Sequence, residues 1–263
     1  MASAPQPSLP LFYQDLMPLN SRDHAKWRSR AVDAIEWAAG HHAIPLTVEE
    51  FAQAQRNFPI VFSSGDNSVP LALMGLNEGV NTFIDADGKP DGEFYLPAYI
   101  RRYPFMLARL TPDAEDLSLC FDPTCDAIGA FDDGEPLFDE AGKPAAQTQA
   151  ALDFCQGFEE AGAKTQAFMQ EIAKYDILMD GEISITMNDA PEKPYVYSGF
   201  RMVDHEKLRN IDNDVLAEWN NNGILAILHA HLFSLDLMRV VFSRQYGQGK
   251  APQQVAQTVD APA

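Results

Sequence analysis

The sequence predicts an α+β fold, in which an antiparallel β meander and a later hairpin pack against a long amphipathic helix and a buried C-terminal helix. Three observations predict it. Residues 59–96 consist of short β-rich segments separated by turn-forming runs such as "GDNS" and "DADGKPDG". Residues 145–176 repeat apolar side chains at helical spacing. Residues 223–244 are apolar nearly all round, which is typical of a buried helix.

The composition is that of a folded, acidic protein. The chain has 263 residues, of which 46% are hydrophobic and 22% are charged, and its formal net charge is -19. A chain of this length buries about 70 to 75% of its unfolded surface, which is enough for a substantial core. The negative charge repels polyphosphate and anionic lipid, so we expect no binding to nucleic acid.

Cysteine use and hydropathy predict a cytoplasmic protein. The three cysteines, Cys120, Cys125 and Cys155, are odd in number and sparse, which favours a reducing compartment over a disulfide framework. The N-terminus has no basic segment followed by continuous apolar residues, so no secretory signal is expected. The most apolar run, residues 223–242, carries histidines and charged residues, and we expect no membrane span.

One folded domain is expected over residues 9–246. Residues 1–8 are rich in Pro, Ser and Ala, and residues 247–263 lack an apolar face, so both ends are predicted to be disordered tails. An alternative arrangement has two lobes divided near residues 120–145, because "DPTCDAIGAFDDGEP" resembles a long loop.

The first elements are predicted from helix signals. Residues 21–40 begin with a polar serine, carry apolar residues at helical spacing and stop at Gly40, which predicts a helix. A short second helix is expected after the capping box formed by Thr47 and Glu50, whose side chains can satisfy each other's backbone donors.

The meander is predicted from four segments, "PIVFSS", "VPLALMGL", "VNTFID" and "EFYL", with a further strand at "LSLCF", residues 117–121. The second hairpin joins "EISITM" to "YVYSGFRMV" around "NDAPEKP". Asp204, Asp212 and the run Asn220 to Asn222 are expected to cap three closing helices.

Two segments share the form D-x-x-G-K-P, at residues 85–90 and 139–144. Both follow an apolar pair. An aspartate accepts local backbone hydrogen bonds and a glycine adopts positive φ, so the pattern favours a tight turn over a ligand loop.

No complete catalytic motif is present. The sequence has no G-x-x-x-x-G-K-[ST] phosphate loop and no G-x-S-x-G, and the "DADG" turn lacks the later ligands of an EF-hand. No cofactor is therefore predicted. "HAH" contains the only weak metal candidates, His229 and His231, but residues two apart on a helix point to opposite sides. We predict no metal site.

The stretch "FYLPAYIRRYPFML", residues 94–107, is the candidate binding site, with Tyr99, Arg101, Arg102 and Tyr103 as its residues. Two prolines delimit a short helical or turn segment, so adjacent arginines must point to different sides. The inward arginine could stack on tyrosine and pair with a carboxylate in a structural role. Alternatively, a guanidinium beside tyrosine hydroxyls could recognise an anion.

Several segments in order resemble the bacterial SapC-like family: "MPLNSRDHAKW", "IPLTVEEFAQAQRNFPIVF", "NTFIDADGKPDGEFYLPAYIRRYPFML", "PLFDEAGKP" and "LFSLDLMR". The similarity runs over about residues 12–244. The resemblance implies a surface-layer-related protein, in gene neighbourhoods with TonB-dependent receptors and halogenase-like enzymes. It implies no catalytic residues.

Three functions follow from these observations. We expect a non-catalytic accessory or binding protein of a bacterial surface-layer or envelope nutrient-uptake system, which recognises a protein partner or a small anionic ligand. The alternative is a soluble enzyme that acts on a peptide or amino-acid-like substrate through the arginine and tyrosine side chains. A third possibility is a subunit of a hetero-complex that docks through "LPLFYQDL" near its N-terminus.

Overall fold

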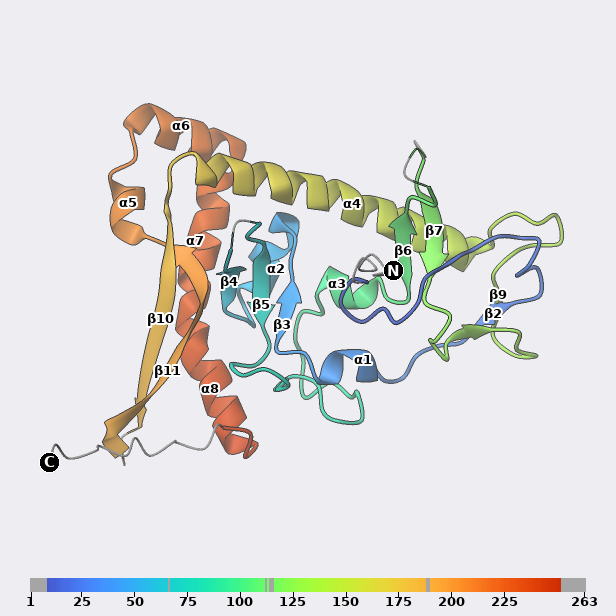
Figure 1. The fold of residues 1–263 in the computed structure, drawn as a ribbon, viewed down its shortest axis with the longest axis horizontal. Helices are drawn as coiled ribbons and strands as arrows, with labels where there is room; N and C mark the ends of the chain where they lie inside the picture. Colours follow the sequence, from blue (N-terminus) through green and yellow to red (C-terminus); the bar gives the residue numbers. More distant parts are fainter. Residues whose placement is uncertain (1–8, 66, 112, 114–115, 188–189, 252–263) are drawn as a thin grey trace, which may run out of the picture.

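The computed structural model describes residues 9–65, 67–111, 113, 116–187 and 190–251. Its elements form three antiparallel sheets and a set of helices, so the predicted α+β class is confirmed (Figure 1). The largest sheet has five strands in the order β10-β11-β4-β5-β3. Their bounds are β10 Leu178–Met187, β11 Ala190–Val203, β4 Ile60–Ser63, β5 Pro70–Leu73 and β3 Ala43–Pro45.

The predicted hairpin and part of the meander belong to this one sheet. The hairpin of β10 and β11 is longer than the two sequence segments that predict it. It joins β4 through the pairs Phe200 with Ser63 and Arg201 with Phe62. Segments that are far apart in the chain therefore share one sheet.

Two smaller sheets lie toward the other end of the molecule (Figure 1). One contains β1, β7 and β6, and the strand predicted at residues 117–121 is confirmed as β7. The other contains β8, β2 and β9. The bounds are β1 Met17–Pro18, β7 Ser118–Phe121, β6 Phe105–Ala108, β8 Ile128–Gly129, β2 Arg28–Ser29 and β9 Glu135–Pro136.

The long amphipathic helix is confirmed as α4, Ala146–Ala173. It runs across the molecule from the side of β6 and β7 to the top of the five-stranded sheet (Figure 1). Phe168 and Ile172, in its last turns, are buried in the same core as Ile60 and Phe62 of β4. One face of α4 thus connects the two ends of the fold.

The helix predicted over residues 21–40 is wrong. Only α1, Glu36–Ala39, is helical there, and residues 28–29 form β2. The indole of Trp27 packs edge-on against the rings of His24 and Phe121 at 4.6 and 5.8 Å between centroids. These long-range contacts and the pairing of β2 outweigh a local helical pattern.

The capping box is confirmed. Thr47 and Glu50 bond reciprocally at the start of the single-turn η1, Val48–Glu50, which continues into α2, Phe51–Ala54. The strands predicted at residues 80–85 and 93–96 are absent from the described structure, apart from one bridge between Ile84 and Pro90. The side chain of Asn81 takes the place of strand pairing there, because its Oδ1 accepts hydrogen bonds from the backbone N–H groups of Phe83 and Ile84.

The two D-x-x-G-K-P segments are turns, as predicted. Asp85 accepts from the backbone N–H groups of Asp87 and Lys89, and Asp139 accepts in the same way from residues 141 and 143. The glycines at the fourth positions both have φ of 75°, a conformation that glycine adopts at little cost.

The closing helices are α5 His205–Arg209, α6 Asn213–Asn222, α7 Ile224–Ser234, η2 Leu235–Leu237 and α8 Met238–Gly247. Asp204 caps α5 through its side chain, as predicted. Asp212 occupies the N-cap position of α6 without a side-chain hydrogen bond. Asn222 accepts from the N–H of Ile224 at the start of α7.

The apolar C-terminal helix predicted over residues 223–244 is present as a rod of three consecutive segments, α7, η2 and α8. One face of the rod is buried against the sheet, while Phe233 on its other face is 68% exposed, so only part of its apolar surface lies in the core. By length and composition alone, Ile224–Gly247 is apolar enough to cross a membrane, although one face of it is buried in the fold.

The predicted tails lie mostly outside the described residues. Residues 247–251 are described, and the ammonium of Lys250 donates to the backbone oxygen of Asn81 at 2.9 Å.

Candidate functional site: an arginine–aromatic cluster beside an apolar pocket

A buried carboxylate positions the "YIRRY" segment. The single-turn helix α3, Ala98–Arg101, begins after Pro97, and its first N–H donates to Oε1 of Glu50 at 2.7 Å. The hydroxyl of Tyr95 donates to the same oxygen at 3.0 Å. Glu50 is 5% exposed, and its second oxygen accepts from Thr47. The capping box of η1 therefore also fixes the start of α3.

Arg102 is the inward arginine. It is 7% exposed, and its guanidinium carbon lies 4.3 Å from the ring centre of Tyr99, 4.5 Å from that of Phe158 and 5.7 Å from that of Tyr13. The predicted stacking on tyrosine is thus confirmed. The predicted carboxylate partner is absent among the described residues, and Nε of Arg102 is buried without a hydrogen-bond partner. The guanidinium of Arg102 therefore contacts the faces of aromatic rings.

The cluster changes the ionisation of its neighbours. Burial raises the pKa of the Tyr13 hydroxyl far above its usual value, and the positive charge of Arg102 opposes that rise. Burial also raises the pKa of the Cys155 thiol to about 11, again opposed by Arg102. Both groups remain neutral and protonated at physiological pH, so neither is an activated nucleophile.

The other candidates point elsewhere. Arg101 is exposed and donates to the hydroxyl of Tyr95 at 3.1 Å. Tyr103 stacks on Trp37 with centroids 4.7 Å apart, and its hydroxyl donates to Asp122 at 3.4 Å. The four residues of the predicted site therefore do not converge on one point. Tyr99 is the member that lines a pocket.

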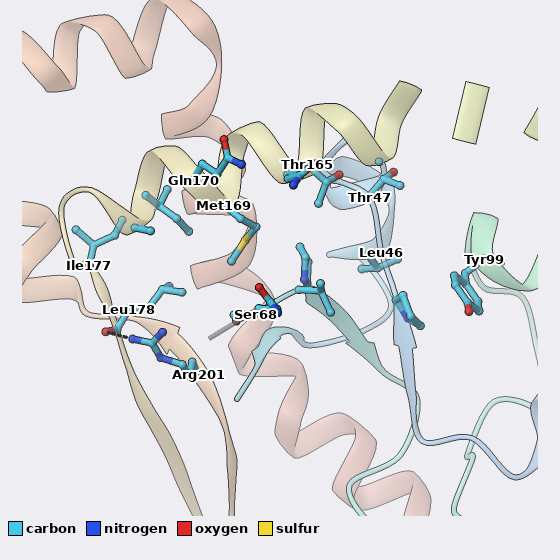
Figure 2. Close-up of a pocket in the computed structure, with 18 of the residues that line it drawn as sticks. Leu46, Thr47, Ser68, Tyr99, Thr165, Met169, Gln170, Ile177, Leu178 and Arg201 are labelled. Carbon is cyan, nitrogen blue, oxygen red and sulfur yellow. Dashed lines mark hydrogen bonds between the residues drawn. The ribbon is translucent and has the colours of Figure 1, made fainter. Parts of the chain in front are cut away.

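That pocket, of about 760 Å³, lies beneath α4 (Figure 2). Its wall is contributed by α4, the end of β3 and the segment after it, Tyr99 of α3, the loop before β5, the start of β10 and one residue of β11. Apolar side chains dominate, with a few uncharged polar groups among them. The apolar lining includes Leu46, Met169, Ile177 and Leu178, and the uncharged polar lining includes Thr47, Ser68 and Gln170.

The two ends of the pocket differ in chemistry. In Figure 2, Tyr99 lies at one side and Arg201 at the other, with Leu46 and Met169 between them. Arg201 donates from Nη2 to the backbone oxygen of Leu178 at 3.0 Å. It forms no ion pair with any described residue, so its remaining N–H groups are available.

Asp176 is the one carboxylate among the described residues that line the pocket, and it is already paired. Asp176 contacts the ammonium of Lys207 at 2.7 Å, and this hydrogen bond holds the pKa of Asp176 below its usual value. Asp180 of β10 is the cross-strand partner of Arg201 in β11, but the two side chains form no ion pair. Arg201 therefore lines this end of the pocket without an ion pair to either carboxylate, although its positive charge also helps to lower the pKa of Asp176.

Helix α4 leaves space for the pocket at Gly162. A Cβ added there would meet no atom within 4 Å. One turn away, the hydroxyl of Thr165 donates to Ala161 and accepts from the N–H of Val48 at 2.9 Å, so α4 is fixed onto η1. Helix α4 thus covers the pocket and is held in place at Thr165, while the missing side chain at Gly162 leaves open space beside the helix.

The two histidines of "HAH" point apart, as predicted. His231 is fully buried and stands where β11 and β4 separate. The N–H of Val203 donates to its Nε2 at 3.0 Å, and its Nδ1 donates to the carbonyl of Ile60 at 2.8 Å. Both ring nitrogens are used in the core. His229 is exposed and bonds to the carbonyl of Leu225 in its own helix, so the two imidazoles have no common ligand position.

Sequence reasoning found Tyr99 and missed the rest of the pocket. Arg201 is a strand residue and Gly162 a helix glycine, and neither stands in a local motif. The residues come together only because α4 lies over the start of the hairpin.

Comparison with curated proteins gave no match, and comparison with solved structures gave none either. The family model described as SapC matches residues 19–240, which is most of the chain and includes the pocket lining and all of the arginine–aromatic cluster except Tyr13. The chain therefore belongs to the SapC family.

Proposed function

We propose that this SapC-family chain is a non-catalytic binding protein that holds a small, largely apolar molecule in the pocket beneath α4. The observation that carries the proposal is the pocket itself. Its volume of about 760 Å³ lies within the range of 300 to 1,000 Å³ that is typical of small-molecule sites. An apolar wall with a few placed polar groups is the usual lining of such sites.

The polar groups define the ligand further. Arg201 supplies N–H donors at one end, and the walls between it and Tyr99 are apolar. A molecule with an apolar body and one anionic or hydrogen-bond-accepting end matches this gradient. This proposal keeps the expected small anionic ligand but moves its recognition from Arg101 and Arg102 to Arg201.

The proposal of binding without turnover is supported by what lines the pocket. Among its described lining residues, the charged ones are Asp176 and Arg201, and the carboxylate is engaged by Lys207. Catalysis of the general acid–base or nucleophilic kind requires a nucleophile or base within hydrogen-bond reach of a partner. No such pair lines the pocket in the described part of the chain.

The biological setting rests on family resemblance alone. SapC-like proteins are associated with surface layers and envelope uptake systems, and an accessory protein that holds an apolar ligand is compatible with either. The proposed location is the cytoplasm, in keeping with the sparse, reduced cysteines.

Two fluorescent probes test the proposal. Anilinonaphthalene sulfonate has an apolar body with one anionic group, and N-phenylnaphthylamine is the same fluorophore without the sulfonate. We expect wild type to bind both, and Arg201→Met to weaken only the sulfonate probe by about tenfold, the equivalent of one charge-assisted hydrogen bond. Absence of binding by both probes contradicts the pocket function. Equal sulfonate binding by the variant contradicts only the role of Arg201.

A further inference from the structure

One stripe of α4 lines the pocket along most of the helix. Its members recur at spacings of three and four residues, so they lie on one helix face. They are Phe158, Gly162, Thr165, Met169 and Ala173. About four turns of helix, or about 22 Å, separate the first member of this α4 stripe from the last. The pocket is therefore elongated, and Figure 2 shows its labelled residues spread along α4 between Tyr99 and Arg201.

Every hydroxyl group in the described wall already donates a hydrogen bond within the protein. The acceptors are Glu50 for Thr47, the carbonyl of Ser63 for Ser68, the carbonyl of Leu11 for Tyr99 and the carbonyl of Ala161 for Thr165. The wall amides, those of Asn67, Gln166 and Gln170, belong to exposed residues that water reaches. The body of a ligand therefore meets mainly apolar contacts, and a peptide backbone would lack partners there.

The two ends of the pocket differ in exposure. Tyr99 is buried, and the guanidinium of Arg102 stacks behind the rings of both Tyr99 and Phe158, at 4.3 and 4.5 Å from their centres. At the other end, the side chain of Asp176 is 79% exposed and Arg201 is half-buried. A charged group at Arg201 thus remains in reach of water, while an apolar group beside Tyr99 does not.

The charges at the open end favour an anion there, although the net charge of the chain is -19. At physiological ionic strength, exposed charges more than about 8 Å apart are largely screened, so the nearest groups decide. Asp176 is paired with Lys207, and Arg201 forms no ion pair with any described residue. A guanidinium matches a carboxylate in geometry and charge.

We propose that the ligand of this pocket is a long-chain fatty acid, with its carboxylate at Arg201 and its alkyl chain along α4 toward Tyr99. This inference rests on the proposed binding function and names the class of ligand. At about 1.3 Å per carbon, which follows from C–C bonds of about 1.5 Å, a chain of about 16 to 18 carbons spans the α4 stripe. If a methylene takes the room of one water molecule, about 30 Å³, such a chain fills about 500 Å³. The pocket of about 760 Å³ holds one such chain but not two.

Chain length is the first test, by isothermal titration calorimetry of the full chain with fatty acids below their micelle concentrations. Each buried methylene should raise the affinity about fourfold, so hexadecanoate should bind about a hundredfold more tightly than dodecanoate. Gly162 lies about 16 Å from Ala173 along the stripe, the length of about 12 or 13 carbons. Gly162→Leu should therefore reduce this preference below about fivefold. Gly157→Leu, outside the pocket, should keep it.

The head group is the second test. 1-Dodecanol has the chain of dodecanoate without the carboxylate, and wild type should bind it about tenfold more weakly than dodecanoate. Arg201→Met should remove this difference, because the variant lacks the guanidinium that recognises the anion. Circular dichroism and thermal unfolding of each variant verify that it folds.

Four outcomes would overturn the proposal. Equal affinity of wild type for dodecanoate and hexadecanoate contradicts the elongated site, and equal affinity for dodecanoate and 1-dodecanol contradicts the anionic head. A preference for hexadecanoate that persists in Gly162→Leu means that the chain lies elsewhere. Binding of N-phenylnaphthylamine without binding of any fatty acid removes the fatty acid alone and leaves the proposed function intact. If neither binds, both proposals fail.

Discussion

The guanidinium of Arg102 lies 4.3 Å from the ring centre of Tyr99, and Tyr99 also forms part of the wall of the pocket beneath α4. The arginine that is buried in the aromatic cluster thus supports a side chain of the proposed binding site without lining that site itself. The neighbouring Arg101 is exposed, so the adjacent arginines provide a matched pair for experiment.

We expect Arg102→Ala to lower the free energy of unfolding by about 2 kcal/mol, because it removes a buried stem and a desolvated cation in contact with three rings. Arg101→Ala should change it by about 0.5 kcal/mol or less, as is usual at an exposed position. Urea unfolding measures both values. Equal effects of the two substitutions would show that the aromatic cluster does not depend on its cation.

The buried Glu50 and the exposed Glu49 can be compared in the same way as the two arginines. Glu50→Ala leaves the donors of Thr47, Ala98 and Tyr95 without their acceptor in a buried site, so we expect a loss of about 3 kcal/mol. Glu49 pairs with Lys164 at the surface, and Glu49→Ala should cost about 0.5 kcal/mol or less. Chemical denaturation compares them. A Glu50→Ala protein as stable as Glu49→Ala would mean that α3 is positioned by other contacts.

His231 makes stability depend on pH. Burial lowers its pKa in the folded protein from 6.5 to about 4. Between these values the unfolded chain binds the proton and the folded chain does not, so protonation favours unfolding. The contribution of the neutral imidazole is complete above pH 6.5 and declines as the pH falls toward 4, by about 3 kcal/mol in all.

The measurement is the free energy of unfolding of wild type, His231→Gln and His229→Gln at several pH values from 7 down to 4, which spans the window set by that pKa. We expect the acid-dependent loss to shrink in His231→Gln, which has no proton to take up at this position. It should persist in His229→Gln, since His229 is exposed. Parallel pH profiles for all three proteins would rule out His231 as the source.

The elements that the sequence predicted well are those specified by local patterns. The periodic apolar residues of α4, the Thr47–Glu50 capping box and the paired D-x-x-G-K-P turns all depend on contacts within a few residues. The predicted helix over residues 21–40 failed because β2 pairs with strands about 100 residues away. A local helical pattern carries no information about such partners.

In the candidate site, too, the features set by local sequence were predicted and the features set by residues distant in sequence were not. Proline positions and helix geometry predicted that Arg101 and Arg102 point to different sides, which the structure confirms. Which one is buried depends on Phe158 of α4 and Tyr13 of the N-terminal segment, both distant in sequence. The pocket lacks any local signal, because its walls come from segments between residues 45 and 201 that meet only in the folded chain.

Two glycines of α4 test most directly whether the space beneath this helix binds an apolar ligand. A side chain at either Gly162 or Gly157 would meet no close atom, but only Gly162 lines the pocket. Replacing a helix glycine by leucine should stabilise either variant by about 0.5 to 1 kcal/mol, so both should fold.

The measurement is a titration of wild type, Gly162→Leu and Gly157→Leu with N-phenylnaphthylamine, followed by fluorescence. Pocket binding predicts that Gly157→Leu binds the probe like wild type and that Gly162→Leu binds at least about tenfold more weakly, because leucine occupies the cavity. Equal affinity of the two leucine variants would contradict the claim.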